Sequence, residues 1–326
     1  MRDGSSTGFH KNLTAVSSKA LIGWYGSLQG HGTVGDLRSM QSVTQALHQA
    51  QLPFVHASAT SDEGIEGTNV ALGEVDPREI GALVFVCGPV IRNHQVGEAL
   101  FGRFPDARRI GVGVSVLPPD NPLHDQPFDV VFAREGWAEP FEDVAIVAPS
   151  AGISAPTLRS GPLRVGLALR GFQPEYGTCL NQRVDDLVKQ TLERLTEASE
   201  LEVVEIEHHL VRAGMSAHAV EALYAGCDLI ITSRYHGGVF ALRQGVPFLA
   251  IDQIEGGAKV LNLLGGRGWP HVFAAAETSA DELAEVARRL LRDEDASLLR
   301  DTADRMRGGA RVTLATLVQA VAESLA

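Results

Sequence analysis

The chain contains little cysteine and no cysteine pair with redox or metal-binding spacing. Its 326 residues include only three cysteines, Cys87, Cys179 and Cys227, and these are widely separated. An odd number without a C-x-x-C spacing argues against a disulfide framework and indicates a reduced, cytoplasmic compartment. Cys87 and Cys227 lie in apolar runs, so we expect both to be buried as small hydrophobic side chains.

The chain also lacks an apolar segment of the kind found in signal peptides and membrane spans. Residues 1–19 are polar and rich in small residues, with no hydrophobic stretch among them. Neither a signal peptide nor a membrane span is therefore expected, and we interpret residues 1–19 as a mobile N-terminal tail.

An excess of positive charge is missing as well. The formal net charge is −12, which opposes binding to nucleic acid or to an anionic membrane surface. A local basic pocket can still bind a small anion. With 44% hydrophobic and 21% charged residues, the composition is that of an ordinary globular protein.

Several well-known catalytic motifs are absent from the sequence. It contains no G-x-S-x-G, H-E-x-x-H or Walker motif, which argues against serine hydrolase, zincin and P-loop chemistry. The adjacent His208 and His209 would point to opposite faces of an extended segment and could not easily share one ion. We therefore expect no metal site.

What the sequence does contain is an alternation of apolar runs and amphipathic stretches that repeats in two halves. The length exceeds the usual size of one core, so the pattern predicts an α/β protein with two Rossmann-like lobes and parallel sheets. We assign residues 20–150 to the first lobe, 151–162 to a linker rich in proline, serine, alanine and glycine, and 163–308 to the second lobe. Residues 309–326 are expected to form a C-terminal helix that packs across the lobes. The expected strands are residues 20–25, 53–57, 82–87, 110–114, 128–132, 163–169, 201–206, 229–232 and 248–251.

The most informative segment is 227–259. A short apolar strand ends in Arg234 and His236, and a helical pattern follows after two glycines. In open α/β sheets, ligands bind beyond the carboxyl ends of the strands, which is where these two side chains fall. The segment therefore predicts an anion-binding site.

The same segment resembles the polysaccharide pyruvyl transferase family. The matching positions are Asp228, Leu229, Ile230, Ile231, Thr232, Arg234, His236, Phe240, Ala241, Leu242, Gly245, Val246, Pro247, Leu249, Ala250, Ile251 and the later Lys259. The resemblance implies a fold like that of B-type glycosyltransferases, with the ligand cleft between the lobes. It also implies transfer of the enolpyruvyl unit of phosphoenolpyruvate to sugar hydroxyls as a ketal, without a further cofactor.

The resemblance places phosphoenolpyruvate on the second lobe. Arg234 can bind its phosphate or carboxylate through a bidentate fork, and His236 can give and take protons near neutral pH. Arg170, at the end of the first strand of this lobe, and Lys259 are further candidate anion ligands. In the alternative interpretation, Arg234 and His236 only cap the strand end or pair with an acidic neighbour such as Asp252.

The first lobe carries a glycine-rich loop, residues 30–35, with the formal pattern G-x-G-x-x-G. No acidic residue ends the second strand, so a dinucleotide site is weakly supported. Gly35 and Asp36 match the G-N-x-G-D element of the resembling family, with Thr33 in place of asparagine. They are candidate ligand contacts, as is His31, although Asp36 could equally be a helix N-cap.

Three more residues are candidates for the acceptor side. Arg134 resembles the start of the family's R-D-x-x-S element, but Glu135 replaces the aspartate and Ala138 stands where the serine falls. Asp252 and Glu255 could bind acceptor hydroxyls, or they could simply line a polar loop.

The sequence therefore leaves three functional hypotheses. The leading one is a pyruvyl transferase whose acceptor is a saccharide, a nucleotide-sugar or a lipid-linked saccharide, with lobes that close to exclude water. The alternatives are a B-type glycosyltransferase or sugar-nucleotide epimerase, and an inactive family member acting as a binding subunit. The sequence leaves open whether the protein forms a homo-oligomer.

Overall fold

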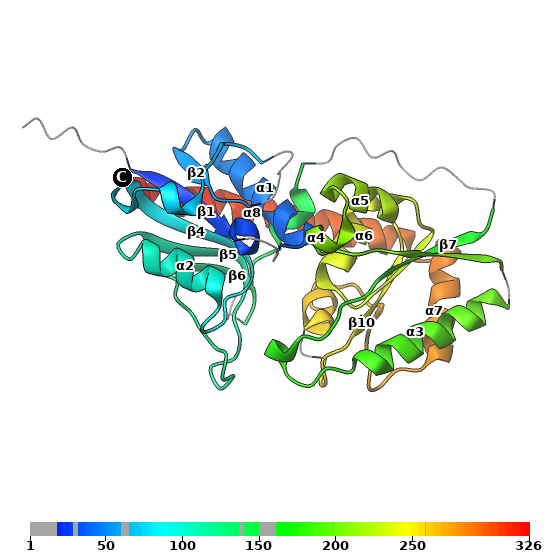
Figure 1. The fold of residues 1–326 in the computed structure, drawn as a ribbon. Coiled ribbons are helices and arrows are strands. Elements are labelled where there is room, and N and C mark those ends of the chain that lie inside the picture. Colours follow the sequence, from blue (N-terminus) through cyan, green and yellow to red (C-terminus); the bar gives the residue numbers. More distant parts are fainter. Residues whose placement is uncertain are drawn as a thin grey trace, which may run out of the picture.

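The computed structural model describes residues 18–28, 32–59, 65–136, 140–149, 161–197, 199–257 and 259–326. It shows two α/β lobes lying side by side, each built around a parallel sheet (Figure 1). The predicted fold class is confirmed. The expected tail and linker lie almost entirely outside the described residues, but Lys19, assigned to the tail, is the first residue of a strand.

The sheet of the first lobe has the strand order of a doubly wound fold. Its strands are β1 (Lys19–Trp24), β2 (Phe54–His56), β3 (Thr68–Asn69), β4 (Ile80–Pro89), β5 (Arg108–Ser115) and β6 (Val130–Glu135). They are arranged β3-β2-β1-β4-β5-β6, and all neighbours are parallel. The central β4 is almost wholly buried, as expected when helices cover both faces of a parallel sheet. The chain order reverses between β1 and β4, so a crevice forms at their carboxyl ends.

The sheet of the second lobe is also parallel and doubly wound, but it has fewer strands. It consists of β7 (Leu163–Ala168), β8 (Leu201–Glu205), β9 (Leu229–Thr232), β10 (Phe248–Asp252) and β11 (Val272–Ala274). They are arranged β11-β10-β9-β7-β8, again all parallel. The order reverses between β7 and β9. The second crevice therefore lies at the carboxyl ends of these two strands.

Helices cover the sheets and connect the strands. They are α1 (Val34–Gln49), α2 (Gln95–Arg103), α3 (Asn181–Thr196), α4 (Leu210–Ala213), α5 (Ala217–Ala225), α6 (Tyr235–Gln244), α7 (Ala280–Leu291) and α8 (Ala296–Leu325), with a 3-10 turn, η4 (Val144–Val147), after β6. Ser279 caps α7, because its side chain accepts a hydrogen bond from the Glu282 amide. None of the helices in the described part of the chain is both long and apolar enough to cross a membrane.

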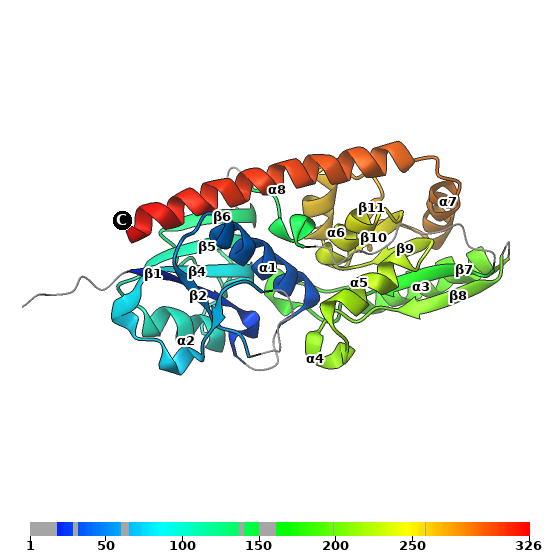
Figure 2. The same ribbon diagram turned by 90° about the horizontal axis from the view of Figure 1, so that it is seen from above.

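The last helix crosses from the second lobe to the first. Figure 2 shows α8 running along both lobes, and it packs against α6 as well as against β4, β5 and η4. The sequence analysis places a boundary at residue 309, whereas the helix continues without a break for 30 residues. Gly309 has a packing reason, since a Cβ there would lie 2.3 Å from Glu142 Cγ. This glycine lets the helix approach the first lobe closely.

Polar contacts also join the lobes next to α1. The Val34 amide donates to the His208 carbonyl at 2.8 Å. Further along α1, the Arg38 guanidinium lies 2.6 Å from the Glu221 carboxylate on α5, which Arg243 of α6 also approaches at 3.3 Å. All three side chains of this interlobe ion cluster are buried.

Candidate active site

A cavity of about 340 Å³ opens where the two crevices meet. Tyr25 follows β1, Pro89 ends β4, Arg170 follows β7 and Arg234 follows β9, and all four line it. Its volume lies in the range that small-ligand sites occupy. The predicted ligand cleft is therefore found between the lobes, with each lobe supplying part of the wall.

Arg234 enters the cavity from the start of α6, but part of its guanidinium is already bound. Nε donates to the Leu169 carbonyl at 2.9 Å, and Nη2 donates to Glu207 Oε1 at 3.2 Å. Burial, together with the nearby Arg170, lowers the pKa of Arg234 to about 10, so it remains charged at neutral pH. The acidic partner is thus Glu207 and not Asp252, which corrects the alternative drawn from the sequence.

Arg170 also lines the cavity, as the sequence analysis expects for a strand-end arginine. Its Nη1 lies 2.9 Å from His209 Nε2, and its amide donates to Ser233 Oγ at 2.7 Å. Within the described residues, no carboxylate lies within ion-pair distance of this guanidinium. Its charge is therefore available to an anionic ligand.

Lys259 provides a second cation of this kind. Its Nζ lies 3.8 Å from the centre of the Tyr176 ring, and only 9% of the residue is exposed. Burial lowers the pKa of Lys259 to about 8, against the raising effect of Glu135. In the described ranges, the ammonium has neither a hydrogen-bond partner nor an ion-pair partner. A buried charge without a partner is costly unless a ligand supplies the counter-charge.

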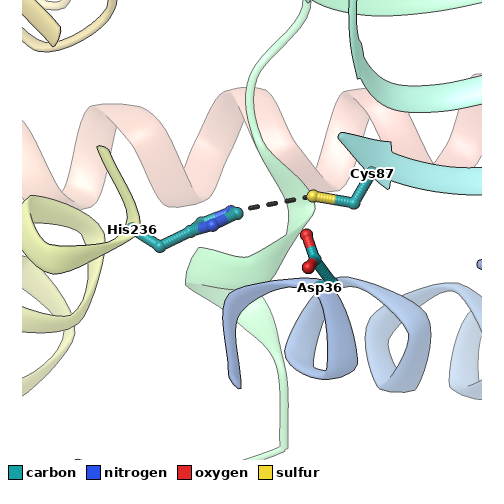
Figure 3. Close-up of side chains that lie close together, drawn as sticks. All are labelled: Asp36, Cys87 and His236. Carbon is teal, nitrogen blue, oxygen red and sulfur yellow. Dashed lines mark hydrogen bonds between the residues drawn. The ribbon is translucent and has the colours of Figure 1, made fainter. Parts of the chain in front are cut away.

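His236 lies in the first turn of α6, between groups of the first lobe. Figure 3 shows its ring directed toward Cys87, with the Asp36 carboxylate beside them. Nε2 lies 3.1 Å from Asp143 Oδ2 and 3.9 Å from Cys87 Sγ. On the other side of the ring, a Cβ on Gly35 would come within 2.1 Å of Nδ1. The predicted Gly35 therefore makes room for the predicted His236.

Arg134, at the end of β6, completes this polar cluster. Its Nη1 donates to Asp143 Oδ2 at 2.9 Å and to Cys87 Sγ at 3.3 Å, and it lies 3.4 Å from His236 Nε2. Asp36, Cys87 and His236 each place one potential ligand atom within 4.8 Å of the others. A guanidinium this close opposes the binding of a metal cation there by charge repulsion.

Cys87 is buried as predicted, but its surroundings are polar as well as apolar. Burial raises the pKa of its thiol well above the usual value, although Arg134 acts in the opposite direction. Its backbone adopts a φ of 67°, and Gly88 continues with a φ of 75°. A positive φ is uncommon for residues other than glycine and often occurs at functional sites.

Asp36 lines the cavity, but it is not the N-cap of α1. Thr33 is the N-cap, and its amide and hydroxyl both donate to Asp36 Oδ2, at 3.0 and 2.8 Å. The Asp36 amide in turn donates to the Thr33 hydroxyl. This reciprocal capping box fixes the Asp36 carboxylate at the N-terminus of α1.

Besides Gly35, two of the candidate acceptor ligands do not line the cavity, and a third lies outside the described residues. Asp252 is fully buried and accepts hydrogen bonds from the amides of Ile254, Lys259 and Leu261. It therefore shapes the loop that carries Lys259 and is not available to an acceptor. Glu255 is exposed on that loop, and its amide donates to the Thr178 carbonyl. The third candidate is His31.

The sequence analysis missed Asp143. This first-lobe carboxylate is fully buried, accepts from the Ala145 amide as the N-cap of η4, and contacts both Arg134 and His236. An aspartate before the apolar run 144–148 is a signal for a cap. Its contact with His236 spans 93 positions and leaves no local signal in the sequence.

Comparison with solved structures first defines the class of fold. A spinosyn rhamnosyltransferase, SpnG, with thymidine diphosphate has a TM-score of 0.54 and 13% identity, covering 92% of this chain and 98% of its own. A Staphylococcus aureus MnaA structure with UDP has a TM-score of 0.56 and 11% identity, covering 87% and 91%. A putative UDP-N-acetylglucosamine 2-epimerase from Listeria monocytogenes has a TM-score of 0.54 and 12% identity, covering 88% of this chain and 90% of its own. The chain thus has the two-lobed fold of B-type glycosyltransferases and epimerases.

The sequence comparison then points to one family. The family model of polysaccharide pyruvyl transferases matches residues 174–253, which include both Arg234 and His236. The match confirms the resemblance over that segment and supports the prediction of a transferase. A search of curated proteins gave no match.

Proposed function

We propose that the protein is a pyruvyl transferase that moves the enolpyruvyl group of phosphoenolpyruvate onto hydroxyls of a saccharide or saccharide-linked acceptor, forming a pyruvate ketal. The observation that carries the proposal is the pair Arg170 and Lys259, two cations without a described carboxylate partner in the cavity that contains His236. Phosphoenolpyruvate carries two anionic groups, a carboxylate and a phosphate, and so matches two cations.

The contacts of the arginines suggest how the donor binds. Arg170 offers a planar fork for one anionic group, and Lys259 offers a point charge for the other. Glu207 and Leu169 already engage Arg234, which therefore contributes positive potential and holds the strand end that precedes Arg170. The geometry thus favours Arg170 over Arg234 as the principal anion ligand.

His236 is the group best suited to move protons in this reaction. The C3 carbon of the donor gains a proton and becomes a methyl group, while C2 becomes an oxocarbenium-like centre. Two acceptor oxygens form bonds to C2, and the bond from C2 to the phosphate oxygen breaks. The acceptor hydroxyls lose two protons in total. One of them corresponds to the proton that C3 gains, and the other leaves with phosphate. His236 lines the same cavity as these cations and contacts first-lobe groups, which supports a role in carrying one of these protons.

The first lobe provides the wall on which we place the acceptor. Tyr25 and His94 line the cavity there, with their rings 4.7 Å apart in an edge-to-face arrangement, and Asp36 adds a carboxylate. Ring faces and carboxylates are suited to the apolar face and the hydroxyls of a sugar. The three cysteines are all free, in keeping with the cytoplasmic location that we propose.

The proposal can be tested by isothermal titration with phosphoenolpyruvate and, separately, with uridine diphosphate. Phosphoenolpyruvate should bind the natural protein and lose at least about tenfold in affinity in Arg170→Ala. Arg212→Ala is the matched control, because Arg212 is an exposed arginine on α4 that does not line the cavity. Phosphate release with a panel of saccharides then tests turnover.

The other hypotheses predict different results. Binding of uridine diphosphate alone would contradict the proposal and favour a glycosyltransferase or epimerase, whose fold the chain shares. Binding of phosphoenolpyruvate without phosphate release on any acceptor would favour an inactive binding subunit.

A further inference from the structure

Asp143 belongs to the first lobe, yet its carboxylate contacts a functional side chain of the second. Oδ1 accepts from the Ala145 amide at 2.8 Å, and Oδ2 accepts from Arg134 Nη1 at 2.9 Å. The same Oδ2 lies 3.1 Å from His236 Nε2. Asp143 is fully buried and does not line the cavity, so it can act on a substrate only through its neighbours.

The hydrogens available around His236 Nε2 determine which partner donates. Arg134 Nη1 carries two hydrogens, and Asp143 Oδ2 and Cys87 Sγ already accept them. Nη1 also lies 3.4 Å from Nε2, which is the longest of its three contacts. An ionised carboxylate can only accept. The contact between His236 and Asp143 is therefore a hydrogen bond in which Nε2 is the donor.

The charge of Asp143 is consistent with this direction. Burial by itself would raise the pKa of its carboxyl group, but the charges of His236 and Arg134 and the hydrogen bond from His236 outweigh burial and hold the pKa below its ordinary range. The carboxylate therefore stays ionised at neutral pH, where it can stabilise the imidazolium that forms when His236 takes up a second proton.

We propose that Asp143 is the positioning residue of His236, and that it holds the imidazole with its proton on Nε2 so that Nδ1 exchanges protons with bound substrates. Gly35 packs against the Nδ1 side of the ring, and its lack of a Cβ leaves room for the imidazole in this orientation. Exchange with substrates rests on the proposed function, whereas the position of the proton does not. The first lobe then supplies both an acceptor wall and the group that orients the second-lobe histidine.

The test is the tautomer of His236, measured by nitrogen NMR on protein labelled with 15N-histidine, without substrate and at a pH at which the ring is neutral. The chain has eleven histidines, so comparison with His236→Gln assigns the signals. We expect Nε2 to carry the proton in the natural protein and the Nδ1–H form to become populated in Asp143→Asn. A natural protein with the proton on Nδ1, or an Asp143→Asn protein with unchanged signals, would overturn the proposal. The measurement on the natural protein does not need Asp143→Asn and remains decisive if that variant does not fold.

Asp295→Asn is the matched control. Asp295 lies 2.9 Å from His271 Nε2 in a second histidine–carboxylate pair that does not line the cavity. This variant should change the His271 signals and leave those of His236 unchanged. A change at His236 would mean that loss of an aspartate from another histidine–carboxylate pair has the same effect, and it would overturn the proposal.

Kinetics provide a second readout. Asp143→Asn should lower kcat by about 10²–10⁴-fold and leave the Kd for phosphoenolpyruvate within about twofold, as expected for loss of an orienting carboxylate. An unchanged kcat would overturn the positioning role. If phosphoenolpyruvate does not bind the natural protein at all, the proposed function fails, while the tautomer result still decides the role of Asp143.

Discussion

Gly35 has no side chain, and His236 occupies the space that one would need. A Cβ at this position would lie 2.1 Å from His236 Nδ1, far inside contact distance, so Gly35→Ala must displace the ring or the start of α1. We expect kcat to fall by about 10²-fold or more, with little change in phosphoenolpyruvate affinity because Arg170 and Lys259 are untouched. Gly102→Ala is the control, since a Cβ at that position of α2 would meet nothing within 4 Å. Steady-state kinetics and titration distinguish the two variants, and normal turnover in Gly35→Ala would contradict the placement of His236.

Lys259 should give donor binding a pH dependence. Burial lowers its pKa to about 8, so the ammonium is present below that pH and is lost as the pH rises through it. Phosphoenolpyruvate affinity should therefore fall, by about tenfold between about pH 7 and about pH 9. A bound anion will move the transition to a somewhat higher pH.

Two substitutions separate this effect from other titrations. Lys259→Met should bind phosphoenolpyruvate weakly at every pH in this range, because the charge is absent throughout, whereas Lys259→Arg should keep its charge and show a flat profile. If Lys259→Met retained the slope of the natural protein, another group would be responsible. Titration calorimetry in buffers of different pH provides the measurement.

At the scale of single elements, the start of α1 combines stability with a functional position. Thr33 and Asp36 form the capping box, and Asp36 also lines the cavity. Thr33→Ala removes the cap and should lower the free energy of unfolding by about 1 kcal/mol. Thr33→Ser keeps a hydroxyl and should restore most of that stability. Urea unfolding of the three proteins checks this expectation, and equal midpoints would show that the cap contributes nothing.

The elements also differ in how well they can be predicted from the sequence. Long apolar strands such as β4 and the strand–turn–helix of β9 and α6 could be predicted, because their patterns are local and Arg234 and His236 follow at a strand end. The strands β3 and β11 could not, since two or three residues carry no clear alternation. The pairing of Asp143 with His236, and of Glu207 with Arg234, depends on how separate elements meet in space. The choice between the two roles considered for Asp252 depends on the same kind of contact, because its carboxylate accepts hydrogen bonds from three amides of its own loop.

For the whole molecule, the interlobe ion cluster of Arg38, Glu221 and Arg243 argues against a large hinge motion. Glu221 is fully buried between two arginines from different lobes. Glu221→Gln leaves these guanidinium groups without a counter-charge and should destabilise the protein by about 3–5 kcal/mol. Chemical denaturation measures the loss; a change below about 1 kcal/mol would contradict a cluster that holds the lobes together.

The same contacts lead us to predict little further closure of the lobes over substrate. The hydrogen bond from the Val34 amide to His208, the ion cluster and α8 join the lobes in an arrangement that already forms the cavity. Small-angle scattering should therefore give the same radius of gyration with and without phosphoenolpyruvate. A marked contraction on binding would restore the closure hypothesis.

The path of α8 also affects what a broken chain could still do. The helix lies after the second lobe in sequence but packs on β4, β5 and η4 of the first (Figure 2). If a protease cut the backbone between residues 149 and 161, the C-terminal fragment would remain bound to the N-terminal fragment through the contacts of this helix. The two fragments should then migrate together on a sizing column, separate only in denaturant, and retain a site for phosphoenolpyruvate. Covalent continuity between the lobes would thus be dispensable for their assembly once the protein has folded.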